Sequence, residues 1–236
     1  MHQAIVITPV KDSLKTTLQC AEAIQLSDIP VRHIIFNDFS TEETKKGLEE
    51  YKNKWNYELI HLENITQKPS PNYDLVLQYG QKVAMETNLP LMVVESDVIV
   101  NKDTLSGMLN FYKKNKKIGM IGAVTVDKGG AVNYPYLKFA EEKADILNTK
   151  RSLSFCCTMF SNEFLSSYDF HQLRKDKDWY DTSISKKALE LGFENYLLKN
   201  LPVLHLPHSS RPWKFLKYKN PVLYYLKKFF GGKDKI

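Results

Sequence analysis

The sequence contains no apolar run longer than a strand, so no segment of it is expected to cross a membrane. The first ten residues, MHQAIVITPV, lack the charged stretch, apolar stretch and cleavage site of a secretory signal, so we expect a cytoplasmic protein. Only three cysteines are present, Cys20, Cys156 and Cys157. Adjacent cysteines rarely bridge each other and no pair has the spacing of metal ligands, so we expect buried, reduced thiols.

Glycine-rich phosphate-binding loops are also missing. The residues after the first predicted strand read TPVKDS, without the G-x-G-x-x-G of a dinucleotide-binding Rossmann site. The chain contains no G-x-x-x-x-G-K-[ST], so it is not a P-loop NTPase, and the absence of G-x-S-x-G argues against an α/β-hydrolase. A protein of this kind that binds phosphates needs another positive group, such as a divalent cation held by carboxylates.

Positive charge is concentrated at the end of the chain. Residues 211–236 hold eight Lys and Arg against one Asp, a net charge of +7, whereas the whole chain carries only +6. Residues 1–210 therefore sum to −1. Because the body of the protein is not basic, we expect no binding of nucleic acid.

Strand-like and helix-like segments alternate along residues 1–127. Predicted strands occupy 3–8, 31–36, 57–62, 91–96 and 118–126, and predicted helices occupy 13–26, 41–54, 72–87 and 102–115. This βαβ rhythm predicts an α/β fold with a mainly parallel, doubly wound, Rossmann-like sheet and helices on both faces. After residue 127 the pattern loosens: 153–160 is a predicted strand, 178–192 a predicted helix ending at Gly192, and ENYLLKN and PVLHL two short strands.

Polar residues mark the carboxyl ends of three predicted strands. Thr8 and Pro9 end the first, Asp38 follows the second, and the stretch LMVVESDVIV carries Glu95 and Asp97 at the end of the fourth. The carboxyl ends of parallel strands line one crevice, where such sheets bind their ligands. Side chains at i and i+2 of a strand share a side, so Glu95 and Asp97 are expected to point the same way. Two like charges need a positive partner, and a structural ion pair is the alternative to a ligand.

The order of these segments resembles glycosyltransferase family 2, the inverting nucleotide-sugar enzymes of the GT-A fold. IVITPVKDSLKTTLQCAEAI is similar to the family's first strand, nucleotide-contacting turn and first helix, and HIIFNDFSTEET to its second strand with a D-D-x-S-x-D-x-T turn. VVESDVIVNKDTLSGML resembles the D-x-D strand end, DKDWYDTSISKKALELGF the E-D-x-x-L helix, and PVLHLPHSS the strand with a late histidine. The resemblance implies one domain over residues 1–210, with a nucleotide-sugar-binding half (1–127) and an acceptor and catalytic-base half (128–210), followed by a basic aromatic tail (211–236).

The resemblance assigns the nucleotide site to the strand ends. Its implied contacts with the nucleobase and ribose are Thr8, Pro9, Asp38 and Glu95. The sequence departs from the family pattern in three places: Glu95 replaces the usual first Asp, Asn37 replaces the first Asp of the turn, and Phe39 stands where the family often has Gly. A turn of different shape is therefore expected, and uridine is the expected base.

The metal site that the resemblance implies contains Asp97. It would hold Mn²⁺ or Mg²⁺, since hard divalent cations bridge protein carboxylates to substrate phosphates. A late histidine would be a further ligand, either His205 or His208, and His205 is favoured because it ends a predicted strand. A structural histidine is the alternative.

An inverting transfer needs a base for the acceptor hydroxyl. The helix DKDWYDTSISKKALELG offers three aspartates, and alignment to the family motif through Ile184 selects Asp181. Asp178 is the second choice, as a helix cap or supporting residue. Trp179, beside the base, could stack on a sugar ring or pack the start of the helix. A carboxylate in a first helical turn also stabilises the helix, which is the alternative role for Asp181.

The tail interleaves lysines with seven aromatic residues in the stretch PWKFLKYKNPVLYYLKKFF. Basic and aromatic residues together suit an anionic membrane surface, so we expect peripheral contact with the inner face of the cytoplasmic membrane. A helix folded back onto the domain, or a contact in a homodimer, is the alternative. If the tail binds membrane, the expected acceptor is a lipid-linked saccharide, as in bacterial surface-polysaccharide assembly.

Three functions fit the sequence. The first is a metal-dependent inverting glycosyltransferase of hexosyl type that moves a sugar, expected to be UDP-linked, to a saccharide or lipid-linked acceptor. The second is a nucleotidyltransferase, which usually has a Gly-rich, Arg- or Lys-bearing turn where this chain has TPVKDS. The third is a non-catalytic nucleotide-sugar-binding or scaffold protein, which the departures at Asn37, Phe39 and Glu95 favour.

Overall fold

The computed structural model describes residues 1–173, 179–206, 222, 223 and 226 of the 236-residue chain. Its strands are β1 (Ala4–Val10), β2 (Val31–Asn37), β3 (Glu58–His61), β4 (Leu91–Val94), β5 (Val98–Ile99), β6 (Ile118–Val126), β7 (Ile146–Asn148), β8 (Cys157–Phe160) and β9 (Glu194–His205). Its α-helices are α1 (Leu14–Gln25), α2 (Glu42–Tyr51), α3 (Tyr73–Thr87), α4 (Thr104–Lys114), α5 (Asn162–Ser167) and α6 (Tyr180–Glu190), and its short 3₁₀ helices are η1 (Leu62–Asn64), η2 (Leu137–Phe139) and η3 (Phe170–Gln172). Every strand and helix predicted for residues 1–127 is present, with ends that differ by a few residues.

The strands form one mixed sheet in the order β3-β2-β1-β4-β8-β6-β9-β5, and β7 pairs with β9 outside this path. Strands β1 to β4 are parallel to one another, and β6 is parallel to β9. Strand β8 lies antiparallel between β4 and β6. The prediction of a mainly parallel α/β sheet is therefore confirmed, and β8 is a reversed strand that the sequence pattern did not indicate.

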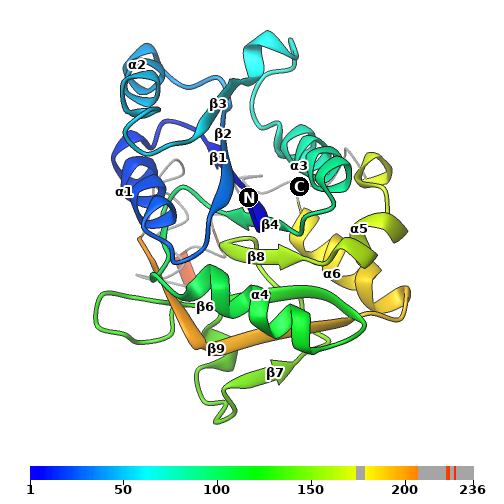
Figure 1. Cartoon of the computed structure of the whole chain (residues 1–236). Coiled ribbons are helices and arrows are strands. Elements are labelled where there is room, and N and C mark those ends of the chain that lie inside the picture. The colour runs from blue at the N-terminus through cyan, green and yellow to red at the C-terminus, as the bar shows by residue number, and fades with distance from the viewer. Residues whose placement is uncertain (174–178, 207–221, 224–225, 227–236) are drawn as a thin grey trace.

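Alternate residues of the central strands point to opposite faces of the sheet, as a period of two requires. Ile5 and Ile7 of β1 pack in a core with α3, α5 and α6, whereas Ala4 and Val6 pack in a second core with α1 and α4. Figure 1 shows α1 on one side of the sheet and α3, α5 and α6 on the other. Each fully buried aliphatic side chain contributes about 1.5–3 kcal/mol, so both layers of helices stabilise the sheet. The three cysteines are buried, unbridged thiols in the second core, as predicted.

Helix α6 has a buried stripe of Tyr180, Ile184 and Ala188, spaced four residues apart. The stripe packs into the first core and fixes the rotation of the helix. Asp181, one residue after the start of the stripe, therefore lies half-buried at its edge. The helix ends just before Gly192, whose φ of 82° is a left-handed conformation that glycine adopts without strain. The predicted glycine cap is confirmed.

Strand β9 is one long strand, rather than the two short strands predicted from ENYLLKN and PVLHL. Its pairing with β6 jumps from Leu198 to Val203, so the intervening residues leave the regular ladder. Pro202 lies in this interruption, and because proline cannot donate to a ladder, the sequence is typical of two separate strands. Beyond the interruption β9 continues to His205, which pairs with Val98 of β5 and so reaches the acid pair.

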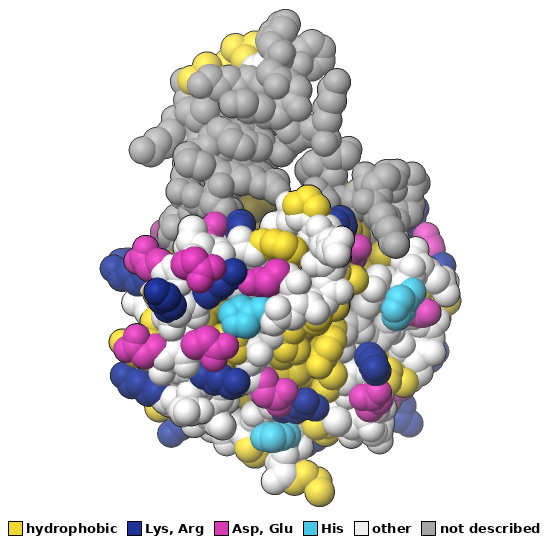
Figure 2. Space-filling model, turned by 90° about the horizontal axis from the view of Figure 1, so that it is seen from above, with side chains coloured by type: hydrophobic (Ala, Val, Ile, Leu, Met, Phe, Trp, Pro, Cys, Tyr) yellow, Lys and Arg dark blue, Asp and Glu magenta, His cyan; other side chains and the backbone are white. Residues whose placement is uncertain are grey.

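Within the described residues, no helix has the length and apolar character needed to span a membrane. In the view of Figure 2, acidic and basic side chains are interspersed on the surface that is drawn in colour. This mixture agrees with the small net charge of residues 1–210.

Candidate functional site

The carboxyl ends of β1, β2 and β4 are tied together by hydrogen bonds. In the turn after β1, the Asp12 N–H donates to Ser40 Oγ at 3.0 Å, and the Thr41 N–H donates to Asp12 Oδ1 at 2.7 Å. The hydroxyls of Ser13 and Ser96 lie 3.1 Å apart and join the ends of β1 and β4. The predicted convergence of these strand ends at one edge of the sheet is therefore confirmed.

Glu95 and Asp97 lie in a turn between β4 and β5, where the Val98 N–H donates to the Glu95 carbonyl at 3.0 Å. Strand β4 therefore ends before both residues, so the strand period of two does not apply to them, but both carboxylates are close enough to His205 to raise its pKa. Their carboxylates face different neighbours. Glu95 Oε2 lies 3.4 Å from Cys156 Sγ, and Asp97 Oδ2 lies 3.5 Å from His205 Nε2.

His205 is the positive partner of the acid pair among the described residues. Its Nδ1 donates a hydrogen bond to the Tyr134 carbonyl at 2.8 Å, since a carbonyl oxygen can only accept. This bond fixes the ring so that Nε2 faces Asp97. Burial lowers the pKa of His205, but the hydrogen bond and charge of Asp97, the charge of Glu95 and the bond to Tyr134 together raise the pKa above its usual value. A nitrogen lone pair beside a carboxylate needs a proton or a cation between them.

A divalent cation fits this pair of side chains. An imidazole held through Nδ1 presents the lone pair of Nε2 to a metal, and a carboxylate supplies the hard oxygen ligand that Mn²⁺ and Mg²⁺ prefer. In the part of the chain that the structure describes, no group of three or more His, Cys, Asp or Glu side chains is arranged to hold a metal. Asp97 and His205 would supply two of the ligands of such a cation.

The Glu95 carboxyl is held against β8. Burial and the charge of Asp97 raise the pKa of Glu95 to about 7. Burial also raises the pKa of the Cys156 thiol, so the thiol stays protonated and donates to Glu95. The Glu95 N–H donates to the Cys156 carbonyl at 3.0 Å, which adds a main-chain link. The contact between Glu95 and Cys156 could not be predicted, because no sequence pattern pairs two positions 61 residues apart.

Asp181 lies in the first turn of α6, two residues after the N-cap position, which is occupied by Trp179. Its Oδ1 accepts a hydrogen bond from the Thr182 N–H at 2.7 Å. Burial raises the pKa of Asp181 above its usual 3.8, although the bonds from Thr182 oppose the shift. A carboxylate with a raised pKa is a stronger base than an ordinary aspartate. Trp179 is 51% exposed, which leaves its ring open to a ligand, and its sugar-stacking role stays a prediction.

The residues predicted to contact the nucleotide are engaged in internal contacts. Thr8 is fully buried, and its hydroxyl pairs with a buried histidine nitrogen at 3.0 Å. Asp38 accepts hydrogen bonds from Ser70 Oγ at 2.7 Å, from the Asn72 N–H at 2.9 Å and from Asn72 Nδ2 at 2.7 Å. The carboxylate thus anchors the loop that leads into α3. Pro9 is partly exposed, and nucleotide contact by Thr8, Pro9 and Asp38 stays a prediction.

The turn after β2 contains Phe39 in a left-handed conformation with φ of 55°. A residue with a Cβ atom pays about 1–2 kcal/mol for this conformation, which glycine adopts freely. The Lys11 ammonium donates to the Phe39 carbonyl and helps to hold the turn. At this position the backbone therefore has the conformation that a glycine would favour.

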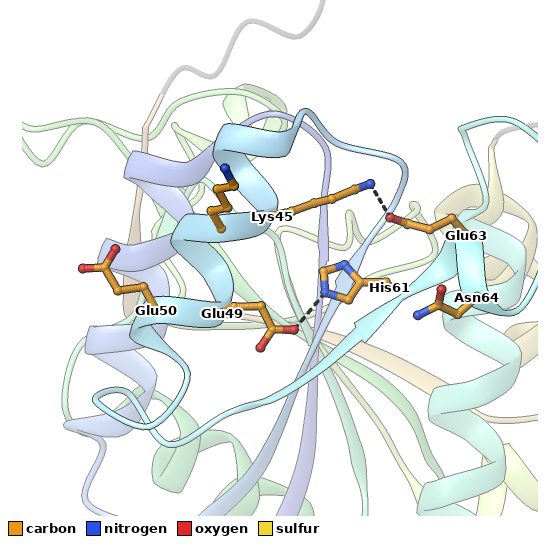
Figure 3. Close-up of a pocket in the computed structure, with 7 residues that line it drawn as sticks. Lys45, Glu49, Glu50, His61, Glu63 and Asn64 are labelled. Carbon is orange, nitrogen blue, oxygen red and sulfur yellow. Dashed lines mark hydrogen bonds and ion pairs between the residues drawn. The ribbon is translucent and has the colours of Figure 1, made fainter.

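A separate pocket of about 570 Å³ lies beside α2 and the β3–η1 segment (Figure 3). Its lining residues are Lys45, Lys46, Glu49, Glu50, His61, Glu63 and Asn64. Lys45 Nζ lies 2.7 Å from Glu63 Oε1, and His61 Nε2 lies 3.0 Å from Glu49 Oε1. Because these charges pair with one another, we assign no ligand to this pocket.

Three predictions fall on residues that the structure does not describe. Asp178 and His208 lie outside the described residues, as does most of the tail 211–236. The roles predicted for them stay predictions. The described tail residues, Val222, Leu223 and Leu226, are helical and exposed.

The order of the strands, the acid pair at the end of β4 and the late histidine on β9 define the class: this is a GT-A fold, as predicted. Residues 5–169, more than half of the chain, match the family model Glycosyl transferase family 2, and the chain belongs to this family. No curated protein matches the chain.

Solved structures share the fold at low sequence identity. The mannosyltransferase PcManGT from Pyrobaculum calidifontis, in complex with GDP-Man and Mn²⁺, superposes with a TM-score of 0.68 at 15% identity over 96% of this chain and 64% of that one. S. aureus TarS 1–349 gives a TM-score of 0.65 at 19% identity over 96% of this chain and 65% of that one. The same TarS fragment in complex with UDP gives 0.59 at 15% identity over 92% and 64%. The chain thus spans under two thirds of the length of these structures.

Proposed function

We propose that the protein is a metal-dependent inverting glycosyltransferase that moves a hexosyl group from a nucleotide-sugar, UDP-linked by preference, to an acceptor hydroxyl. The observation that carries the proposal is the pairing of Asp97 with His205 at the carboxyl end of the sheet. Strand β9 brings this histidine from more than a hundred residues away to the strand-end acid. Both side chains are mostly buried, so desolvation offsets much of the gain from an ion pair, whereas the same two groups suit a metal ligand set.

The proposed reaction is one displacement at the anomeric carbon of the donor sugar. The acceptor oxygen forms a bond to this carbon while the bond to the diphosphate oxygen breaks, and the hydroxyl proton passes to Asp181. When bound, Mn²⁺ or Mg²⁺ neutralises charge on the departing diphosphate. Asp97 and His205 would hold the metal, with the ring of His205 oriented by the Tyr134 carbonyl. Burial of Asp181 suits it to the role of base.

The test is a thermal-shift screen of the full chain with UDP, GDP, ADP and CDP, each with Mn²⁺ or with EDTA. A ligand at about 100 times its Kd stabilises by about 2.7 kcal/mol, which corresponds to a rise in Tm of about 5–10 °C for a chain of this size. We expect UDP to give such a rise with Mn²⁺ and a much smaller one with EDTA. If no nucleoside diphosphate raises Tm, the protein does not bind the proposed donor.

A non-catalytic nucleotide-sugar-binding or scaffold protein is the second candidate. The internal contacts of Asp38 and Glu95 favour it, because both oxygens of Asp38 accept internal hydrogen bonds and Oε2 of Glu95 accepts one from the Cys156 thiol. The two candidates differ in turnover. A protein that binds UDP with Mn²⁺ but releases no UDP from UDP-glucose, UDP-galactose, UDP-N-acetylglucosamine or UDP-N-acetylgalactosamine, with or without saccharide acceptors, supports the second.

We extend the first proposal to a cytoplasmic enzyme that contacts the inner face of the membrane through residues 212–236 and uses a lipid-linked acceptor in surface-polysaccharide assembly. The net charge of +7 over residues 211–236 and the exposed Val222, Leu223 and Leu226 support it. Truncation after Arg211 should leave a nucleotide-binding protein that no longer pellets with anionic liposomes, while neutral liposomes pellet neither form. A full-length protein that ignores anionic liposomes at low salt, where surface charge acts most strongly, would show that the tail is no membrane anchor.

A further inference from the structure

Helix α3 begins with Tyr73, whose hydroxyl has no hydrogen-bond partner among the described residues. The Tyr73 hydroxyl is enclosed, and within the described part of the chain no group lies at hydrogen-bond distance from it. A buried polar group that is left unpaired costs about 1–3 kcal/mol, and such groups are rare in native proteins. A phenylalanine would fill the same space without this cost, so the hydroxyl itself requires an explanation.

The ring of Tyr73 stacks on two other rings. It stacks on Phe155 at 5.8 Å between centroids with 17° between the planes, and on Tyr180 at 6.4 Å with 26°. Phe155 directly precedes Cys156, which contacts Glu95, and Tyr180 directly precedes Asp181. The stacking therefore connects Tyr73 to the residue before Cys156, which contacts Glu95, and to the residue before Asp181, the proposed base.

The electrostatic surroundings of the hydroxyl are negative. Burial raises the pKa of Tyr73 well above 10, and the charges of Glu95, Asp181 and Asp97 act in the same direction. The phenol is therefore a neutral hydrogen-bond donor at physiological pH. It is near three carboxylates, yet it is hydrogen-bonded to none of them.

We propose that the Tyr73 hydroxyl donates a hydrogen bond to an oxygen of the sugar being transferred, and so helps to select that sugar. This inference rests on the proposed function, in which the sugar passes between the diphosphate held at Asp97 and the base Asp181. The Tyr73 hydroxyl is held by ring stacking near both Asp97 and Asp181, so it is placed to donate to a sugar that lies between them. Because the hydroxyl is enclosed, neighbouring side chains must shift when the sugar enters, and contacts in active sites commonly tighten in this way.

The test is Tyr73→Phe, which keeps the ring stacking and removes only the hydroxyl. The Tm of the variant should equal or exceed that of the wild type, because the unpaired group is gone. Binding of UDP with Mn²⁺ should be unchanged. Binding of the UDP-sugar that stabilises the wild type most should weaken by about 3- to 10-fold, the range of a single neutral hydrogen bond. Calorimetric titration with UDP and with that UDP-sugar measures both affinities.

Tyr57→Phe is the matched control. The Tyr57 hydroxyl donates to the Leu48 carbonyl in a different core cluster, so its loss should lower Tm and leave the ratio of the two affinities unchanged. A Tyr73→Phe protein with the wild-type ratio of UDP-sugar to UDP affinity would overturn the inference, as would a drop in its Tm like that of Tyr57→Phe. A wild type that binds neither UDP nor any UDP-sugar would overturn the proposed function and this inference together.

Discussion

Asp181→Asn should keep the fold and donor binding but lower turnover by about 10²- to 10⁴-fold, the usual contribution of a positioned general base. The side-chain oxygen of asparagine can still accept the hydrogen bond from Thr182, so the start of α6 is preserved. What is lost is the basic carboxylate. The loss should appear in kcat more than in the KM for the donor, because the proton moves only as the acceptor attacks. Release of nucleoside diphosphate from the best sugar nucleotide measures both constants.

Two controls separate a base from a structural carboxylate. Asp169→Asn alters an exposed aspartate that accepts a bond from the His171 N–H at 2.9 Å at the start of η3, and it should turn over normally. Asp178→Asn should be milder than Asp181→Asn. A near-normal Asp181→Asn together with an inactive Asp178→Asn would move the base to Asp178.

The pH profile of turnover gives a further check on Asp181. The group works as a base when it is deprotonated, and burial raises its pKa above 3.8. As the pH falls through this raised pKa, Asp181 becomes protonated and the rate should drop. Activity that remains in Asp181→Asn should lack this acid limb. An unchanged acid limb in the variant would assign it to another group.

Asp97→Ala should remove Mn²⁺-dependent nucleotide binding while the fold survives. The Asp97 side chain is only 16% exposed and loses its ion pair with His205 in this variant. Its removal also relieves the repulsion that raises the pKa of Glu95, so the two effects oppose each other and the fold should survive. Loss of a metal-binding carboxylate should weaken UDP binding with Mn²⁺ by at least about 10²-fold, since even residues that only support a ligand contribute 10- to 100-fold. Thermal shift with UDP and a Mn²⁺ titration measures the effect.

Asp103→Ala is the control for this metal prediction. Asp103 is an exposed aspartate at the start of α4 whose side chain makes no cap hydrogen bond. Its loss should leave UDP affinity and the Mn²⁺ dependence as they are in the wild type. The same result in Asp97→Ala would show that Asp97 does not bind the metal.

The local sequence pattern was sufficient to predict the parallel part of the sheet and the edge at which its strands end. Strands such as β1 and β6 are nearly continuous apolar runs, and the helices between them have apolar residues at helical spacing. Once the sheet is parallel, its geometry places the turns after β1, β2 and β4 at one edge, as the Ser13–Ser96 contact shows. His205 was favoured over His208 as a metal ligand because it was predicted to end a strand, and in the structure it ends β9.

The features that the sequence did not predict are contacts between segments that lie far apart in the chain. The contact of Glu95 with Cys156 and the stacking of Tyr73 on Phe155 and Tyr180 arise because β8 and α6 are packed beside α3 and β4. The helical and strand periodicities of a sequence do not indicate which distant segment will pack beside a given residue. The strand predicted over 91–96 ends two residues earlier, at Val94, where its pairing with β8 stops, and the residues that follow form the turn into β5.

The reversed strand β8 has a consequence for the order of synthesis and folding. Strands β4 and β6 both precede β8 in the chain, but β8 (residues 157–160) separates them in the finished sheet. While a ribosome is still adding those residues, β4 and β6 each present an unpaired edge that can bind another extended chain. Pairing segments so far apart in sequence is slow, because the entropy of closing the loop is lost before the strand contacts form and compensate for it. The nascent protein therefore passes through an interval in which its own central strands are its most aggregation-prone surface.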